Sequence, residues 1–345
     1  MHIRYLCRCL GAGQSKLRVS VVTPVRNRKE LLRELIESLW AQSLDTSSFE
    51  IVIVDDCSTD GTPAVLEELQ ARSPCPLVYR ALTPHAGSVR ARNEGVRLAQ
   101  APVLAFTDSD CRATPRWLEL GLAALEAHPD VAFVTGPTLN KPDQPVTFFS
   151  VGGNPRPRDN PIYPLTNAFY RKDVFWEVGG FDESIWLGAV KTTPVEYSDI
   201  DLAYRVLGRG YRNAFVDELI VYHEVLQVSP WHWLMWNLRL VQLPELLGRY
   251  PVLRKSLLWK GPFLSPIHAW FYLGVLGVLA AGVTSGWLAL LLLPYLCRSA
   301  IAPGRGLSMR TLLRAPARLV LLTLRQVFVS AFLLWGSVRA RNLVL

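Results

Sequence analysis

The sequence predicts an α/β fold in which a doubly wound, mostly parallel, Rossmann-like sheet is followed by a C-terminal, membrane-associated helical region. First, β-branched runs alternate with helical patterns in the N-terminal part, as is typical of such a sheet. Second, half of the 345 residues are hydrophobic and 19% are charged, which excludes a disordered or fibrous protein. Third, the charge balance changes after residue 230. The length allows two domains, or one domain with an appendage.

The first elements follow one another in regular order. Residues 18–23 are a β-branched run that predicts a buried strand. Residues 29–42 carry a helical apolar stripe from Leu31 to Trp40, which predicts an amphipathic helix. The alternation then continues as strand, helix, strand, helix and strand over residues 50–54, 62–72, 77–81, 88–100 and 103–106.

The middle of the chain is less regular. Residues 140–165 are rich in Pro, Gly and Asn and predict an irregular loop. Helical patterns resume at residues 172–178 and 198–207. The apolar run 215–222 predicts a last strand before His223. We expect this first domain to end near there.

The chain after the first domain is expected to divide into three parts. Residues 226–262 predict amphipathic interfacial linker helices, because several Trp residues lie close together. Residues 263–302 predict a transmembrane helical hairpin of two short spans. Residues 303–345 predict a basic, interfacial or re-entrant helical tail, since Arg325 and Gln326 interrupt its apolar stretch. The alternative for the whole tail is a buried helical subdomain.

Charge separates the two parts of the chain. Residues 1–230 hold 24 Lys and Arg against 28 Asp and Glu, whereas residues 231–345 hold 13 against one, Glu245. A basic, apolar tail suits an anionic membrane surface. We expect no nucleic-acid partner, because the Arg residues are embedded among Leu, Val and Trp rather than on a polar face.

The expected location is the inner (cytoplasmic) membrane. The first 17 residues contain no apolar run long enough for a signal peptide, so we expect the first domain to face the cytoplasm. The Arg cluster between residues 298 and 318 favours the same side for the end of the hairpin. The six Cys residues lack metal-type CxxC spacing and are expected to be reduced thiols.

Two acidic clusters follow predicted strands, where ligands bind in a doubly wound sheet. Asp108 and Asp110 would repel each other unless a cation lies between them, so a divalent cation with diphosphate oxygens is one interpretation. A polar turn is the other. Asp55 and Asp56 precede a Ser-Thr-Asp-Gly-Thr turn and could accept a hydrogen bond from a nucleobase. The alternative there is a helix-capping turn.

Two further segments carry charged residues at helix starts. Arg90 and Arg92 open a predicted helix and could meet a phosphate, or form a solvated basic face. Asp199 opens another helix and could act as a general base. Asp201, in the same helix, could form a surface pair with Arg205, four residues farther along. His223 could ligate a metal or be structural.

Taken together, these segments resemble the family 2 glycosyltransferases of the GT-A fold, and specifically the membrane-anchored bacterial type. The similarity covers roughly residues 17–225, with the motifs in family order and spacing. The segments that carry it are Val19–Asn27, Val54–Thr62, Ala91–Gly95, Phe106–Asp110, Gly179–Glu183 and Ser198–Leu202.

The resemblance implies an inverting transfer from a nucleotide-sugar donor, and it assigns roles to residues. Asp199 matches the catalytic base, with Ser198 where the family usually has Glu. Asp110, Asp108 and His223 match the DXD and metal positions, for Mg²⁺ or Mn²⁺. Gly180, Phe181 and Asp182 match the acceptor side. The residues implied for binding the nucleotide sugar are Pro24, Arg26, Asn27, Asp55, Asp56, Arg90, Arg92, Asn93, Asp108 and Ser109.

The expected partners are a UDP-, GDP- or dTDP-sugar, membrane lipids, and an acceptor that is lipid-linked or a glycan. Envelope polysaccharide, glycolipid and lipid-linked oligosaccharide all remain open as products. A catalytically inactive membrane scaffold that binds nucleotide is an alternative, and so is a small processive polysaccharide synthase. A nucleotidyltransferase is a further alternative, although it would not be expected to match both the 179–183 segment and Asp199.

Overall fold

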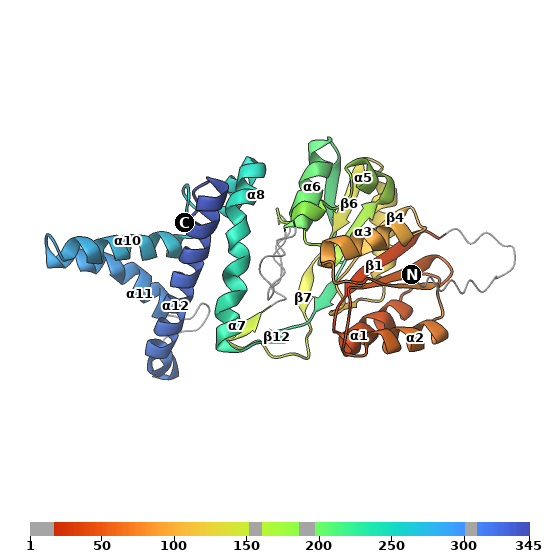
Figure 1. Ribbon diagram of the computed structural model, residues 1–345, viewed down its shortest axis with the longest axis horizontal. Helices are drawn as coiled ribbons and strands as arrows, with labels where there is room; N and C mark the ends of the chain where they lie inside the picture. Colours follow the sequence, from red (N-terminus) through yellow and green to blue (C-terminus); the bar gives the residue numbers. More distant parts are fainter. Residues whose placement is uncertain (1–16, 152–160, 186–196, 301–308) are drawn as a thin grey trace.

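The computed structural model describes residues 17–151, 161–185, 197–300 and 309–345. The N-terminal part is an α/β domain built around a seven-stranded sheet, and the C-terminal part is a helical region beside it (Figure 1). Cys7, Cys9 and Arg305, about which the sequence made predictions, lie outside the described residues.

The central sheet is mostly parallel, as predicted. Its strand order is β10-β6-β9-β4-β1-β2-β3, and every pairing is parallel except those of β9 with β4 and β6. The strands are β1 (Val19–Val25), β2 (Phe49–Asp55), β3 (Leu77–Ala81), β4 (Val103–Phe106), β6 (Val131–Thr135), β9 (Ala168–Arg171) and β10 (Arg212–Phe215).

Alternation along the strands supplies two separate apolar cores. Val19 and Val21 of β1 pack on one face of the sheet with α1, α2 and α4, while Val22 packs on the other with α3, α5 and α6. Both faces are covered, which explains why the strands read as near-continuous β-branched runs. These helices are α1 (Lys29–Trp40), α2 (Thr62–Arg72), α3 (Ser88–Leu98), α4 (Trp117–Ala127), α5 (Lys172–Glu177) and α6 (Ser198–Gly208).

One predicted strand was wrong. The run 215–222 is not a single strand but the end of β10 and the start of β11 (Val221–His223), separated by a turn at Asp217 and Glu218. The two polar residues turn the chain out of the central sheet and into a second one. The sequence also gave no indication of α4, β6 or β9, and the loop predicted over 140–165 contains the short strand β8 (Ser150–Val151), which pairs with β12 (Leu226–Gln227).

The second sheet positions a functional residue. It has the order β5-β11-β7, with β5 covering Cys111–Ala113 and β7 covering Thr138–Asn140. The antiparallel pairing of β11 with β5 sets His223 opposite Cys111. This register brings the end of β11 to the acidic cluster that follows β4.

The C-terminal region is helical throughout its described length, apart from short connections. Its helices are α7 (Pro230–Met235), η3 (Trp236–Gln242), α8 (Leu243–Arg249), η4 (Pro251–Leu253), α9 (Arg254–Leu257), α10 (Pro266–Ala281), η5 (Gly286–Leu292), α11 (Leu293–Ala300) and α12 (Met309–Ala340). Figure 1 shows α12 beside the column formed by α7 and α8, with α10 and α11 extending away from the α/β domain.

The apolar helices of this region differ in length. By length and composition, one described helix could cross a membrane, Pro316–Ala340, and two shorter apolar helices cover Pro266–Ala281 and Gly286–Ser299. The two shorter helices pack as the expected hairpin, in which a Cβ at Gly277 would lie 2.5 Å from the Leu288 carbonyl oxygen. Membrane insertion of the hairpin and of the stretch 319–335 stays a prediction.

Candidate active site

Three parallel strands deliver the predicted site residues to one edge of the sheet. β1 lies between β2 and β4, and Val25 at its end is in register with Asp55 at the end of β2. Asp108 and Asp110 follow β4 at the same edge. Pro24 is half-buried within β1, opposite Val54. The sheet alone therefore gathers residues that are up to 86 positions apart in the chain, from Pro24 to Asp110.

Asp108 is held by two donors. Arg92 Nη2 donates to its Oδ1 at 2.9 Å, and Thr166 Oγ1 donates to its Oδ2 at 3.1 Å. Burial raises the pKa of Asp108, but Arg92, His223 and Thr166 together lower it more, so the pKa lies below its ordinary value. Asp108 is therefore an anion at neutral pH, with Arg92 as its counter-charge.

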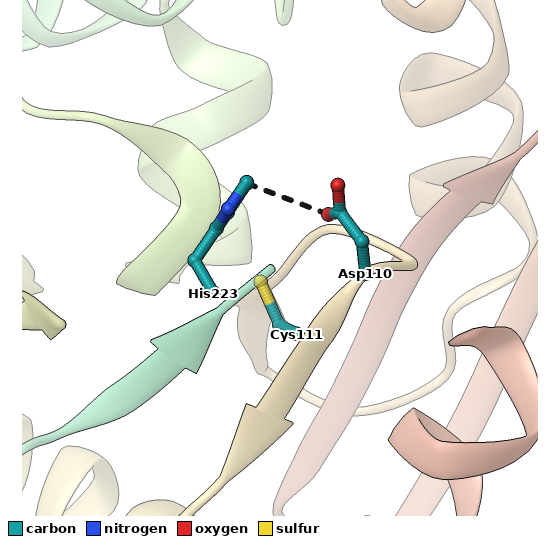
Figure 2. Close-up of side chains that lie close together, drawn as sticks. All are labelled: Asp110, Cys111 and His223. Atoms are coloured by element: carbon teal, nitrogen blue, oxygen red, sulfur yellow. Dashed lines mark ion pairs between the residues drawn. The ribbon is translucent and has the colours of Figure 1, made fainter. Parts of the chain in front are cut away.

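Asp110 is buried and faces two cationic or basic groups. Its Oδ2 accepts a short hydrogen bond from Arg28 Nη1, and its Oδ1 lies 3.5 Å from His223 Nε2. Figure 2 shows Asp110 and His223 pointing toward one another from the loop after β4 and from β11. Ser109 between the two acids is also buried.

The second nitrogen of His223 fixes its tautomer. His223 Nδ1 lies 2.8 Å from the Glu224 carbonyl oxygen, which can only accept, so Nδ1 carries a proton. In the neutral ring the Nε2 lone pair then faces the Asp110 carboxylate. Glu224 is itself fixed by Lys141, whose side chain is 1% exposed and lies 2.9 Å from Glu224 Oε2.

The donor set suits a divalent cation that prefers oxygen and nitrogen. Ligand atoms of Asp110, Cys111 and His223 lie within 4.8 Å of one another. Burial raises the pKa of the Cys111 thiol well above its ordinary value, so the sulfur stays protonated and is a poor ligand. Two facing acceptors remain, a carboxylate and an imidazole nitrogen, and both are common ligands of divalent cations. Asp108 lies beside this group but bonds to Arg92.

The predicted nucleoside side is a pair of interlocked loops. Asn27, with φ +52°, accepts a hydrogen bond from Thr59 N at 2.7 Å, and its own N–H donates to Ser58 Oγ at 2.8 Å. Asp55 Oδ1 accepts from Ser58 N at 3.1 Å and from the Ser58 hydroxyl. Burial raises the pKa of Asp55 despite these bonds. The structure thus builds the loop that was predicted to hold the nucleoside.

Asp56 organises a third loop. Its carboxylate accepts hydrogen bonds from Ala86 N at 2.7 Å and Gly87 N at 2.8 Å, and its Oδ2 lies 2.6 Å from His85 Nδ1. Arg26 Nη1 reaches the other nitrogen of this ring at 2.9 Å. Arg26 therefore joins the loops after β1 and β3, although contact with a base stays a prediction.

Arg90 and Asn93 of α3 have different surroundings. Arg90 is exposed and lines a cavity of about 290 Å³ with His85 and Glu183. The buried Asn93 amide instead donates to the Phe181 carbonyl and to Glu183 Oε1, both at 2.9 Å, and accepts from Phe181 N at 3.0 Å. Asn93 thus positions the segment that was predicted to lie on the acceptor side, and its amide is occupied in doing so.

Side chains of α6 and α8 hold the same segment, residues 180–182, in place. Arg205 donates to the Gly180 carbonyl at 2.6 Å and to Asp201 Oδ2 at 2.8 Å. Asp201 also accepts from Arg249 Nη1 at 2.7 Å, and Arg249 reaches Asp182 at 3.3 Å. The pair of Asp201 with Arg205 forms as predicted, but its placement at the surface was wrong, because Asp201 is 0% exposed and joins the two parts of the chain.

Asp199 lies in the first turn of α6 and is half-buried. Its Oδ1 accepts a hydrogen bond from Ile200 N at 2.9 Å. Burial, reinforced by the charge of Asp199, raises the pKa of Tyr170 in β9 well above its ordinary range.

Comparison with known proteins identifies the α/β domain. Residues 20–179 match the family described as "Glycosyl transferase family 2". This segment is a family 2 glycosyltransferase domain. The motifs Val54–Thr62, Ala91–Gly95 and Phe106–Asp110, for which the resemblance was proposed, lie within it, and so does the motif Val19–Asn27 from its second residue onward.

Relatives of this glycosyltransferase domain have diverse names. The glycosyltransferase AglE of Haloferax volcanii is 25% identical over 213 residues, which are 59% of this chain and 66% of AglE. The validoxylamine A glucosyltransferase of Streptomyces hygroscopicus subsp. jinggangensis is 30% identical over 238 residues, 58% of this chain and 54% of the relative. The match thus spans between half and two thirds of these curated relatives.

A solved structure shows the shared GT-A fold. The mannosyltransferase PcManGT from Pyrobaculum calidifontis, solved with GDP-mannose and Mn²⁺, is 22% identical. It matches 94% of this chain and 87% of its own, with a TM-score of 0.56. The mixed sheet with its parallel centre is therefore the GT-A arrangement.

The site of the glycosyltransferase domain contains residues that the sequence did not single out. Arg28 directly follows Arg26 and Asn27, which were predicted to bind the nucleotide sugar. Its place next to them in the same loop could have pointed to it. Lys141 lies in the stretch 140–165 that was predicted as a loop, Thr166 directly follows it, and no local pattern marks either residue. Tertiary contacts alone bring them to Asp108 and His223.

Proposed function

We propose that this chain is a metal-dependent, inverting glycosyltransferase that transfers a sugar from a nucleotide-sugar donor to a hydroxyl or phosphate acceptor. The observation that carries the proposal is the cluster of Asp108, Asp110 and His223 at the carboxyl edge of a GT-A sheet, with Arg28 and Arg92 beside it. This arrangement combines cation ligands with cations that can meet a diphosphate.

The donor would lie across the edge of the sheet. The interlocked loops of Asn27, Asp55 and Asp56 would hold the nucleoside of a UDP-, GDP- or dTDP-sugar. Asp110 and His223 would hold Mg²⁺ or Mn²⁺, which when bound supplies positive charge to the departing diphosphate. Arg28 and Arg92 already face this point and would exchange their carboxylate partners for phosphate oxygens.

Asp199 is proposed as the general base. It takes the proton of the acceptor hydroxyl while that oxygen forms a bond to the anomeric carbon. The bond from this carbon to the diphosphate oxygen breaks on the opposite face, so the nucleoside diphosphate leaves and the anomeric configuration inverts. Asn93 and Arg205 support this step by holding Gly180 and Phe181, on the proposed acceptor side.

The acceptor is proposed to be lipid-linked, at the cytoplasmic face of the inner membrane. Support comes from the apolar side chains that the helical region leaves exposed, such as Leu276, Leu279, Val283 and Trp287, each more than 60% exposed. Contiguous exposed apolar surface marks a membrane or protein contact. Residues 231–345 hold thirteen basic residues against one acidic residue, and this excess of positive charge suits the surface of an anionic membrane.

The test is a transfer assay on the full-length chain in detergent. Nucleotide release and product formation are measured with Mn²⁺, a panel of sugar nucleotides and a lipid extract as acceptor. Asp199→Asn should reduce transfer about 10²–10⁴-fold, as expected for removal of a general base, while nucleotide binding persists. Transfer unaffected by this change would remove Asp199 as the base.

A second outcome would change the functional class. Nucleotide binding that depends on the metal, without transfer of any sugar in the panel to the lipid extract or to glycans, would favour a membrane scaffold. Long products from one binding event would favour a processive synthase. Product identification by mass spectrometry separates these outcomes from a single transfer.

A further inference from the structure

A cavity with a mixed polar and apolar lining lies in the apolar helical region. It has a volume of about 120 Å³ and is bounded by η3, α10, α11 and α12, away from the residues of the sugar-transfer site (Figure 1). Five polar side chains line it among Leu, Ile, Val and Tyr: those of Asn237, His268, Ser299, Arg325 and Gln326.

Arg325 gives this cavity a positive charge. Within the described ranges, its hydrogen-bonded partner is Asn237 Oδ1, at 3.2 Å from Nη2 and 3.4 Å from Nε. Its guanidinium also stacks 5.2 Å from the ring centre of Trp233. The single acidic residue after position 230, Glu245, accepts a hydrogen bond from Tyr197 instead. The charge of Arg325 is therefore not balanced by a carboxylate of this segment.

Three other polar groups in the cavity wall have no hydrogen-bond partner among the residues that the structure describes. They are His268 Nε2, Ser299 Oγ and Gln326 Nε2, on side chains that are 8%, 1% and 6% exposed. Asn237 is occupied, because its amide nitrogen donates to the Trp233 and Leu234 carbonyls. A buried polar group without a partner is costly, so three around one cavity indicate that something else satisfies them.

The chemistry of these groups selects the ligand. Arg325 and the Gln326 amide nitrogen can only donate, and Ser299 Oγ can donate as well. His268 Nδ1 lies 2.7 Å from Ser265 Oγ, so the ring can accept there and donate through Nε2. A ligand that accepts from all four is an anion with several oxygens. The volume is below the roughly 300 Å³ at which pockets for drug-sized ligands begin, which excludes a whole nucleotide.

We propose that this cavity is a binding site for a phosphate group, distinct from the sugar-transfer site. Arg325 supplies the charge, and Gln326, Ser299 and His268 supply neutral donors around the phosphate oxygens. The phosphate is carried by a lipid headgroup or is free inorganic phosphate, since both present the same oxygens. A charge within a membrane-associated helix is expensive, and a bound anion gives its retention a physical reason.

The experiment measures stabilisation of the full-length chain in neutral detergent. The unfolding midpoint is followed by tryptophan fluorescence against two probes in turn, inorganic phosphate and dioleoylphosphatidylglycerol, at constant ionic strength. The variants are Arg325→Met and Gln326→Glu, the second of which puts a carboxylate beside Arg325 in nearly the same volume. The matched control is Arg339→Met on the same helix, where the guanidinium also stacks on a ring, Trp335, at 5.9 Å but is exposed.

The expected result is a midpoint that rises with probe concentration and saturates. Arg325→Met and Gln326→Glu should each weaken this response at least about tenfold, as for loss of one charge-assisted hydrogen bond, while Arg339→Met leaves it unchanged. A response to both probes identifies free phosphate as sufficient, and a response to the lipid alone identifies a headgroup. Both support the site.

Two results would overturn the proposal. The first is no response of the wild-type chain to either probe, which would mean that water fills the cavity. The second is an equal response of all three variants, which would mean general attraction to a basic surface. Because the readout is stability, it is independent of sugar transfer, and failure of the transferase proposal would leave this result interpretable.

Discussion

The α/β domain and the helical region treat apolar surface in opposite ways. Among large hydrophobic side chains of the described residues, the α/β domain exposes only Val146 and Trp176, and every other exposed one lies after residue 230. The domain buries its apolar residues in two cores, one on each face of the sheet. The helical region has smaller cores and leaves many apolar side chains exposed. Such a surface is typical of a region that contacts lipid or another protein.

The two parts also balance positive charge differently. In the domain, arginines meet carboxylates, as in the pairs of Arg92 with Asp108 and of Arg28 with Asp110. In the helical region, arginines lie over aromatic rings, namely those of Trp233, Trp236 and Trp335. With one acid available after residue 230, cation–π contacts and backbone carbonyls are what remain. Arginines of the domain also lie over rings, as Arg97 does over Trp176, but there carboxylates are available as well, whereas the helical region has almost none of its own.

The two parts meet at a buried charge. Asp201 of α6 accepts from Arg205 of the domain and from Arg249 and Tyr250 of the helical region. Arg249 also reaches Asp182 on the proposed acceptor side. A substitution at this junction therefore tests whether the domain and the helical region fold independently or as one unit.

The largest expected effect comes from Asp201→Asn. Removing this carboxylate leaves Arg205 with backbone carbonyls alone and Arg249 with the more distant Asp182, which should cost up to about 3–5 kcal/mol of unfolding free energy. Urea unfolding in detergent measures it. Asp130→Asn is the control, because Asp130 pairs with Arg212 at the surface, where a pair contributes at most about 1 kcal/mol. A similar small cost for both changes would contradict the junction as described.

The next largest effect is expected at the proposed cation site of Asp110 and His223. Asp110→Asn removes one carboxylate oxygen that faces His223 and should lower kcat/KM for sugar transfer about 10²–10³-fold, with a higher Mn²⁺ requirement. Steady-state kinetics over a Mn²⁺ series checks this. Asp143→Asn serves as the control, since its partner Arg112 is a surface contact on the same small sheet. Equal kinetics in the two variants would place the cation elsewhere.

Membrane affinity should respond in one region and not in the other. Leu279→Lys places a charge on an exposed position of α10, 66% exposed, and should reduce binding to anionic liposomes about tenfold or more. Val146→Lys makes the same change at a 64% exposed position of the domain and should leave binding unaltered. Liposome flotation measures both. If both variants bind less, or neither does, the apolar surface of α10 does not face lipid.

The smallest effect is a pH dependence at the junction. Hydrogen bonds from Ser184, followed by the charge of Arg249, hold the pKa of Asp182 below its ordinary value near 3.8. A carboxyl with a lowered folded-state pKa stabilises the protein above the unfolded-state pKa and loses this contribution as the pH falls. Melting curves of wild type and Asp182→Asn should therefore differ at pH 6 and converge only as the pH falls below 3.8, through the lowered folded-state pKa. A constant difference across this range would assign the effect to packing.

Local pattern was sufficient for most elements of the domain but not for all. The β-branched runs and apolar stripes predicted β1 to β4 and α1 to α3 within a few residues. The prediction of one strand over 215–222 was wrong because the hydropathy of the residues does not indicate where a chain leaves one sheet and enters another. The acidic cluster Asp108–Asp110 and His223 were found as separate signals. Their proximity follows from the pairing of β11 with β5, which has no local signature.

By itself, the sequence determined the fold class, the family motifs and the division into an acidic domain and a basic apolar tail. Those properties depend on composition and on short periodic patterns, which every segment carries within itself. Tertiary structure alone decided that Arg28 meets Asp110, that Asn93 holds Phe181, and that Asp201 is a buried junction. Such contacts join side chains far apart in the chain, and their energies depend on burial and on partners that no single segment contains.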